Sequence, residues 1–258
     1  MENKLLMAHQ VAGYPEDETA ITAAEALIAG GTGILEVQLA FSDPSADGVA
    51  IQTACSTVLS KGYTVKQGLE YISKIRKLHP EIPVFLMTYG CLVYRPGVEN
   101  FVKMAHDAGV SGLIVPDLPF DCDEGLTAVC KKYGMHNIPV AAPSMTEERL
   151  NKMATAGFKY IYTALRAGIT GTKTVITDEM LNFIDKAAAG GSIILGGFGI
   201  STGEQSKALA PHVTGVIAGS VFVNLITSNY DPANLEESRK KIYDAVKAKA
   251  EELTKPLK

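Results

Sequence analysis

The sequence predicts a single (β/α)8 barrel, an α/β fold, and three observations lead to it. Short apolar segments alternate with helical segments eight times in 258 residues, which matches the order and length of such a barrel. No linker or change in composition divides the chain, so we expect one domain over residues 1–258. A doubly wound sheet is the alternative, but AGYP follows the first strand where that fold usually has GxGxxG.

The composition narrows the class of protein. Hydrophobic residues make up 47% of the chain and charged residues 20%, values typical of a well-buried globule rather than a disordered chain. A net charge of −4 without a basic cluster gives no support to a nucleic-acid partner. No apolar run approaches membrane length and no secretory signal stands out, so we expect a cytoplasmic protein with no membrane association.

The four cysteines predict neither a metal site nor a disulfide framework. They are Cys55, Cys91, Cys122 and Cys130, and none forms a CxxC pair. Cys55 lies among apolar helix residues and is expected in the core. All four are expected to be free thiols in a reducing compartment.

The elements follow from local signals. Apolar, β-branched segments predict strands over 5–11, 34–39, 84–88, 112–115, 138–141, 158–163, 192–195 and 214–218. Apolar residues at helical spacing predict helices over 16–30, 49–60, 64–78, 98–108, 123–133, 178–188, 221–226 and 235–253. Capping signals at 64–67, 144–147 and 201–204 begin helices, the last two of which end at 155 and 209. Ala-Gly pairs recur before the next strand, where glycine can end a helix.

The second strand carries the first candidate catalytic group. Side chains alternate along a strand, so Leu35, Val37 and Leu39 share one face and Ile34, Glu36 and Gln38 the other. The leucine face suits packing against helices, which leaves Glu36 pointing into the barrel near its catalytic end. A structural carboxylate bonded to neighbours is the alternative, and a functional role is favoured because active-site groups gather where barrel strands end.

The loop after this strand adds two more carboxylates, Asp43 and Asp47. Asp43 precedes a proline and fits an ordinary turn residue. Asp47 precedes a glycine and fits the N-cap of the next helix. Taken alone, each aspartate favours the structural interpretation.

Glycines after strands seven and eight indicate a phosphate site. The sequence is GGFGIS over 196–201 and Ala218-Gly219-Ser220 before the short helix 221–226. Backbone amides near these glycines and a helix N-terminus can bind an anion. One such loop would be ordinary turn chemistry, but two at these strands point to a phosphorylated ligand.

The loop after strand six is long for a barrel and carries Arg166 and Lys173 among glycines and threonines. Such loops often act as lids, and a solvated surface loop is the alternative. Tyr160 and Tyr162 share one face of strand six. If that face is the interior, Tyr162 would be a pocket wall or a hydroxyl donor.

Six segments together resemble one family. FSDPSADG after the glutamate strand, LMTY at strand three, LIVPDLP at strand four, RAGITG in loop six, GGFGIS and AGS occur in this order. They resemble the α subunit of tryptophan synthase, over about residues 5–226. FSDPxADG with a glutamate seven residues earlier is highly specific, whereas GFGIS is shared more widely among phosphate-binding barrels.

The resemblance implies cleavage of indole-3-glycerol phosphate to indole and glyceraldehyde 3-phosphate, with no metal and no organic cofactor. Glu36 matches the glutamate that protonates the indole carbon and takes the proton from the side-chain hydroxyl. Asp47 matches the aspartate that holds the indole N–H and helps remove its proton. Tyr162 matches a tyrosine near the glutamate. The positions that match the family's phosphate site are Gly171, Phe198, Gly199, Gly219 and Ser220. The positions that match its lid are Arg166 and Thr170.

The departures from the family concern the pocket and the partner. His9 stands where the family usually has an aromatic residue, and Gln38 where it has glycine; with Tyr89, they are counted among the substrate-binding residues. The amide of Gln38 could bond the catalytic carboxylate or fill the pocket. Ala40 and Cys91 replace the usual residues in the loops where the family's PLP-dependent β subunit docks. The sequence therefore supports the β partner less strongly than it supports catalysis.

Two alternatives to the lyase stay open at this point. One is a paralogue whose pocket, altered at His9 and Gln38, takes another phosphorylated substrate or none. The other is a weakly catalytic subunit that mainly activates a β partner.

Overall fold

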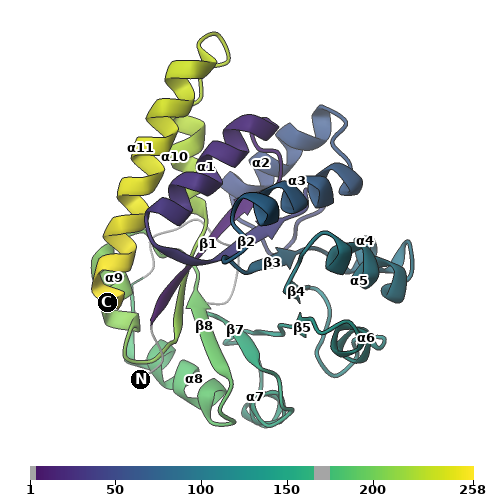
Figure 1. Ribbon diagram of the computed structural model, residues 1–258. Coiled ribbons are helices and arrows are strands. Elements are labelled where there is room, and N and C mark those ends of the chain that lie inside the picture. The colour runs from purple at the N-terminus through teal and green to yellow at the C-terminus, as the bar shows by residue number, and fades with distance from the viewer. Residues whose placement is uncertain (1–3, 166–174) are drawn as a thin grey trace.

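A ring of parallel strands surrounded by helices forms the centre of the computed structural model, which describes residues 4–165 and 175–258 (Figure 1). The strands are β1 (Leu5–Val11), β2 (Thr32–Gln38), β3 (Val84–Met87), β4 (Gly112–Ile114), β5 (His136–Asn137), β6 (Val140–Ala141), β7 (Tyr160–Ala164), β8 (Ile193–Gly197) and β9 (Gly215–Ala218). They pair in the order β5-β4-β3-β2-β1-β9-β8-β7-β6.

The fifth barrel strand is divided, which is why the structure has nine strands where the sequence predicted eight. β5 pairs with β4, and β6 pairs with β7. Ile138 donates its amide to Leu113, while the carbonyl of Pro139 accepts from Tyr162. Proline has no N–H to give to a ladder, so the strand is interrupted at Pro139. The two ends of the sheet thus meet in one short stretch, and the ring closes as a barrel.

The helices cover the outside of this ring (Figure 1). They are α1 (Asp17–Ala29), α2 (Val49–Ser60), α3 (Val65–Leu78), α4 (Gly90–Tyr94), α5 (Val98–Asp107), α6 (Leu126–Lys132), α7 (Glu147–Ala154), α8 (Asp178–Ala188), α9 (Gly203–Leu209), α10 (Ser220–Asn229), α11 (Leu235–Thr254) and the 3-10 turn Lys255–Leu257. The expected capping box is present: Thr64 accepts from the amide of Gln67, whose side chain reaches back to Thr64.

Three helices differ from the prediction, and the first is α10, which runs to Asn229 instead of ending at residue 226. The helix expected from residue 123 begins at Leu126, because the carboxylate of Asp123 accepts the amides of Gly125 and Thr127 in a turn. Short α4 was not expected at all. The carboxylate of Asp117, after β4, accepts the amide of Gly90 at 2.9 Å and so holds the start of α4. This contact joins the ends of β3 and β4.

Alternation along the strands produces two hydrophobic cores. Leu35, Val37 and Leu39 belong to the outer core between strands and helices, as predicted. The inner core fills the barrel with the side chains of Met7, Ile34, Phe85, Met87, Tyr89, Ile114, Ile138, Tyr162, Leu195 and Ile217. It leaves the polar pair at positions 9 and 36 above it, towards the carboxyl ends of the strands.

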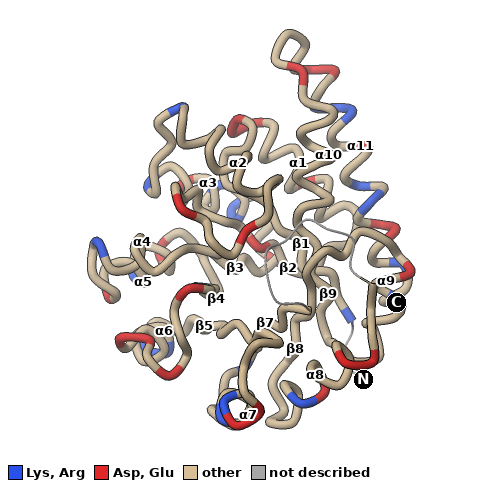
Figure 2. The backbone as a smooth tube through the Cα atoms, turned by 180° about the vertical axis from the view of Figure 1, so that it is seen from behind, with Lys and Arg blue, Asp and Glu red and all other residues tan. Residues whose placement is uncertain are grey.

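The surface carries charges of both signs, and Figure 2 shows them interspersed along the outer helices. Within the described ranges, no helix is long and apolar enough to cross a membrane. All four cysteines are free thiols; Cys55 and Cys130 are buried, and burial raises the pKa of each to about 12.

Candidate active site

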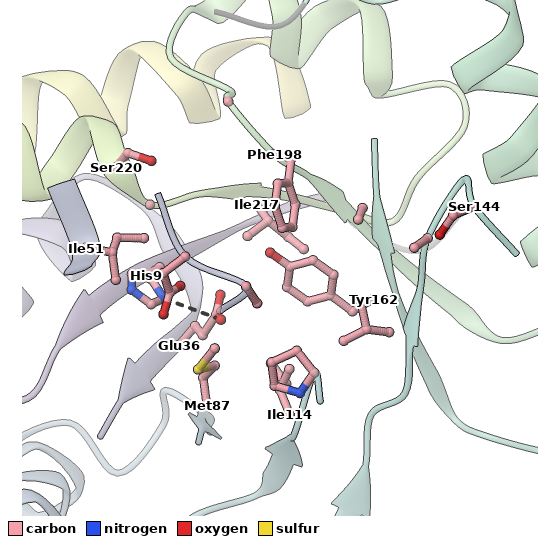
Figure 3. Close-up of a pocket in the computed structure, with 18 residues that line it drawn as sticks. His9, Glu36, Ile51, Met87, Ile114, Ser144, Tyr162, Phe198, Ile217 and Ser220 are labelled. Atoms are coloured by element: carbon pink, nitrogen blue, oxygen red, sulfur yellow. Dashed lines mark ion pairs between the residues drawn. The ribbon is translucent and has the colours of Figure 1, made fainter. Parts of the chain in front are cut away.

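A cavity of about 1020 Å³, including its open mouth, lies where the barrel strands end (Figure 3). Every barrel strand or the loop after it contributes to its wall. The lining residues are His9, Glu36, Ala46, Asp47, Ile51, Met87, Ile114, Pro116, Val140, Ala142, Ser144, Tyr162, Ala164, Phe198, Gly199, Ile217, Gly219 and Ser220. Most are apolar, and the carboxylates and the imidazole gather on the β1–β2 side, a pattern typical of a ligand site.

Glu36 and His9 form a buried pair at the floor of this cavity. They are direct neighbours in the β1–β2 ladder, which aims both side chains at the barrel interior. His9 Nδ1 lies 3.4 Å from Glu36 Oε1, and both residues are at most 4% exposed (Figure 3). The other two polar atoms, Glu36 Oε2 and His9 Nε2, are buried without a hydrogen-bond partner among the described residues. Unsatisfied buried polar groups are costly, so these atoms mark where a ligand would bind.

The charge of His9 depends on this pairing. Burial lowers the pKa of His9, but the carboxylates of Glu36 and Asp47 outweigh it and raise the pKa above its ordinary value. The imidazole also lies against the turn after β9: a Cβ on Gly219 would come within 3.1 Å of His9 Cβ. A glycine at position 219 therefore makes room for the ring of His9.

Asp47 is held from behind by two side chains. Gln38 Nε2 donates to its Oδ2 at 2.7 Å and the Tyr89 hydroxyl donates to the same oxygen at 2.8 Å. Burial raises the pKa of Asp47, and His9, Gln38 and Tyr89 oppose this by favouring the carboxylate. Gly48 occupies the N-cap position of the helix that follows, so the N-cap interpretation of Asp47 is wrong.

Gln38 and Tyr89 thus support Asp47 from behind instead of lining the cavity. Both are at most 1% exposed, and neither belongs to the cavity wall. Gln38 contacts Asp47 and not Glu36, so the expected contact with the strand-borne carboxylate does not form. Tyr89 stacks on Phe41 with ring centroids 5.0 Å apart, which holds the loop after β2 against the segment between β3 and α4.

The β8–β9 side of the cavity, next to β1, is formed largely by backbone. Gly219 is the N-cap of α10, whose N-terminus begins at Ser220 beside the cavity. The first amides of a helix lack intrahelical acceptors and favour anions. Across the turn, Phe198 has a φ of 151° and Gly199 a φ of 72°. A phenylalanine at positive φ is unusual and is often found at binding sites.

Tyr162 forms the cavity wall beside the turn after β8. It comes from β7, lines the cavity and packs edge-on against Phe198, with ring centroids 6.2 Å apart. Burial raises the pKa of Tyr162 well above its usual value, with Glu36 and Asp47 adding to the effect. Its hydroxyl therefore stays neutral.

Comparison with known proteins gives one consistent result. A family model described as "Tryptophan synthase alpha chain" matches residues 1–255. A tryptophan synthase alpha chain of Helicobacter hepaticus is 38% identical over 232 residues, 86% of this chain and 85% of its own length. That of Methanosarcina barkeri is 36% identical over 244 residues, 94% and 91% of the two chains. This chain belongs to the tryptophan synthase alpha chain family.

Solved structures agree. A chain from the tryptophan synthase α2β2 complex of Pyrococcus furiosus superposes with a TM-score of 0.86 at 28% identity, covering 99% of this chain and all of its own. Tryptophan synthase of Mycobacterium tuberculosis gives 0.86 at 27%, covering 99% and 93%. The fold predicted from the βα alternation is thereby confirmed as that of the tryptophan synthase α barrels.

Three of the predicted site residues, Arg166, Thr170 and Gly171, lie outside the described part of the chain. The other ten predicted site residues fall into two groups. His9, Glu36, Asp47, Tyr162, Phe198, Gly199, Gly219 and Ser220 meet in one cavity, and Gln38 and Tyr89 lie behind Asp47, outside the cavity wall. Within the same part of the chain, no group of three or more His, Cys, Asp or Glu side chains could hold a metal ion.

Sequence reasoning missed a polar group and the apolar walls. Ser144 lines the cavity, although it was interpreted only as part of a capping signal; Thr146 is the cap. Met87 and Ile114 are the last residues of β3 and β4 and face inwards. The parity that placed Glu36 inside the barrel, carried along each strand to its end, would have found both.

Proposed function

We propose that this chain cleaves indole-3-glycerol phosphate into indole and glyceraldehyde 3-phosphate, as a carbon–carbon lyase of tryptophan biosynthesis. One observation carries the proposal beyond family membership: Glu36 Oε2, buried and without a hydrogen-bond partner among the described residues, lies in the same cavity as the turn at Gly219 and Ser220. A carboxylate for proton transfer and an anion site then face a single ligand. All the relatives described above carry the same name, which favours neither a diverged paralogue nor a mainly activating subunit.

Glu36 performs the proton transfers. The bond to be broken joins the indole ring to a carbon that bears a hydroxyl. Protonation of the ring carbon makes the ring a leaving group, and removal of the hydroxyl proton turns the side chain into an aldehyde. One carboxyl group can donate the first proton and accept the second, which is general acid–base catalysis by a single residue.

Asp47 binds the indole N–H. Both described bonds to its carboxylate go to Oδ2, which leaves Oδ1 to accept from the ring nitrogen. A carboxylate at this place stabilises the positive charge that develops on nitrogen when the ring carbon is protonated. Tyr162, Met87 and Ile114 form the apolar walls against the ring.

The phosphate binds at the N-terminus of α10. Gly219 and Ser220 supply amides and a hydroxyl, and Phe198 and Gly199 form the facing turn. Arg166, Thr170 and Gly171 complete the lid and the phosphate site by family resemblance. No cofactor takes part in this scheme.

We further propose that the chain assembles with a tryptophan synthase β subunit in the cytoplasm. The support is its similarity to chains of α2β2 complexes over almost its full length. Ala40 is half-buried after β2, and Cys91 is exposed on α4; both differ from the usual residues of these loops. Co-elution with a purified β subunit tests the partner, and we expect Cys91→Asn to tighten the complex.

The lyase activity is tested by indole release from indole-3-glycerol phosphate. We expect Glu36→Gln to lose at least 100-fold in kcat, the lower end of what a general acid–base residue contributes, with the fold intact. Glu70→Gln, on the exposed face of α3, is the matched control and should keep full activity. Unchanged cleavage by Glu36→Gln would rule out the proposed role of this residue.

A further inference from the structure

The two carboxylate oxygens of Glu36 have different surroundings. Oε1 faces His9 Nδ1 at 3.4 Å, whereas Oε2 faces the cavity without a partner in the described residues. A carboxyl group so placed can take a proton on one side and give one on the other. The torsion that carries the two oxygens is broad and two-fold, so a half-turn exchanges them.

The groups around His9 leave it as the one basic side chain at this place among the described residues. Glu36 faces it from β2, and Asp47 from the loop after β2. Tyr162 faces the two carboxylates from β7, and Cys55 and Tyr89 lie behind Asp47. The turn after β9, packed on the imidazole, offers only Gly219 and Ser220, which do not titrate. Two buried carboxylates thus act on one buried imidazole, and Glu36 is the one that contacts it.

We propose that His9 supplies, through Glu36, the proton that reaches the indole carbon, so that the pair and not the glutamate alone is the acid–base unit. This rests on the proposed lyase activity. His9 acts through Glu36 and need not touch the reacting atoms.

The proton transfers balance over one turnover. The Nδ1–H bond of the imidazolium breaks and an O–H bond forms on Glu36, which rotates to face the ring. That O–H bond breaks as the C–H bond forms at the ring carbon. The carbon–carbon bond then breaks and its electron pair returns to the ring, while Glu36 takes the hydroxyl proton and the aldehyde forms. The proton passes back to Nδ1, and the pair regains its starting state.

A purely structural role for His9 predicts something different. A neutral ring that only orients Glu36 could be replaced by an amide that donates from the same place. Asparagine puts a nitrogen close to the position of Nδ1 and keeps the hydrogen bond, but it holds no proton that can be transferred near neutral pH. His9→Asn therefore separates the two roles.

The decisive measurement is the pH dependence of indole release by the wild type, His9→Asn and His9→Phe. The pair must hold one proton to act, and a carboxyl alone loses its proton about 2 pH units below an imidazole in ordinary peptides. We expect the alkaline limb of kcat to move to lower pH by about 1 unit or more in both variants. Binding of an indole-alkyl phosphate without the cleavable hydroxyl checks that each variant is folded.

A second measurement does not depend on turnover. NMR titration of the histidine ring, assigned by its absence in His9→Asn, should show that Glu36→Gln moves the titration of His9 to lower pH. An unmoved titration of His9 would overturn its role but not the lyase proposal. The same holds if the wild type cleaves the substrate and the alkaline limb of His9→Asn is unmoved. Absence of any indole from the wild type would overturn the lyase proposal itself, and the role of His9 with it.

Discussion

The two sides of the cavity recognise a ligand by different means. On the β1–β2 side, His9, Glu36 and Asp47 present buried side chains whose protonation decides what they can do. On the β8–β9 side, Gly219 and Gly199 present backbone, and the helix N-terminus at Ser220 offers amides that never titrate. Chemistry is placed on the first side and binding on the second.

This difference separates rate from affinity. Side chains that exchange protons are expected to act mostly in the transition state, whereas amides around a phosphate hold substrate and transition state alike. Uniform binding lowers KM without raising kcat. Substitutions on the two sides should therefore fall into distinct kinetic classes.

The largest effect that sharpens this comparison is expected at Asp47. Asp47→Asn removes the charge that stabilises the protonated ring but keeps an oxygen for Gln38 and Tyr89, so kcat should fall on the order of 100-fold. Burial raises the pKa of this carboxyl, which means that the charged form is costly to bury, so thermal stability should not fall. Steady-state kinetics and a thermal melt check both parts; a full loss of folding would contradict the assignment.

On the β8–β9 side, Ser220→Ala is expected to have a smaller effect, on KM instead of kcat. Loss of one hydrogen bond to a charged group corresponds to about 1.5–3 kcal/mol, so KM should rise roughly tenfold or more while kcat stays nearly constant. Ser228→Ala, exposed on the same helix, is the control. A drop in kcat without a change in KM would break the division between the two sides.

The β8–β9 side has few side chains because the packing of its strands leaves no room for them. A Cβ at Gly197 would lie 2.4 Å from both Cβ and the carbonyl oxygen of Ile217. Gly197→Ala should therefore lower the free energy of unfolding by about 1–3 kcal/mol, measured by urea denaturation. Gly90→Ala is the matched control, because the added Cβ would meet its nearest neighbour, an oxygen of Asp117, at an ordinary 3.5 Å.

The same contrast explains which parts of the site could be predicted from the sequence. Glu36 was predictable because a carboxylate among buried strand residues is rare and strand parity gives its direction. The turn at Gly219 was predictable because glycines follow two neighbouring strands. Both signals are local, as are the caps and the helical spacing that gave most of the fold.

What the sequence could not give are contacts between distant segments. Gln38 lies on the same strand face as Glu36, yet its amide bonds to Asp47, nine residues away, because the loop folds back over β2. Tyr89 reaches Asp47 from the start of α4, after β3. The division of the fifth strand depends on which neighbours each half pairs with. Such contacts follow from barrel closure, which no local pattern encodes.

The smallest expected effect tests the titrating side through stability. The pKa of His9 is raised in the folded protein, so its pairing stabilises the fold fully below the unfolded value of about 6.5 and less as the pH rises through the folded pKa. The difference in unfolding free energy between the wild type and His9→Asn should therefore be larger at pH 5.5 than at pH 8.5. Urea denaturation at the two pH values measures it. The corresponding difference for Ser220→Ala should be the same at both, because nothing in that turn titrates; a pH-dependent difference there would remove the distinction between the two sides.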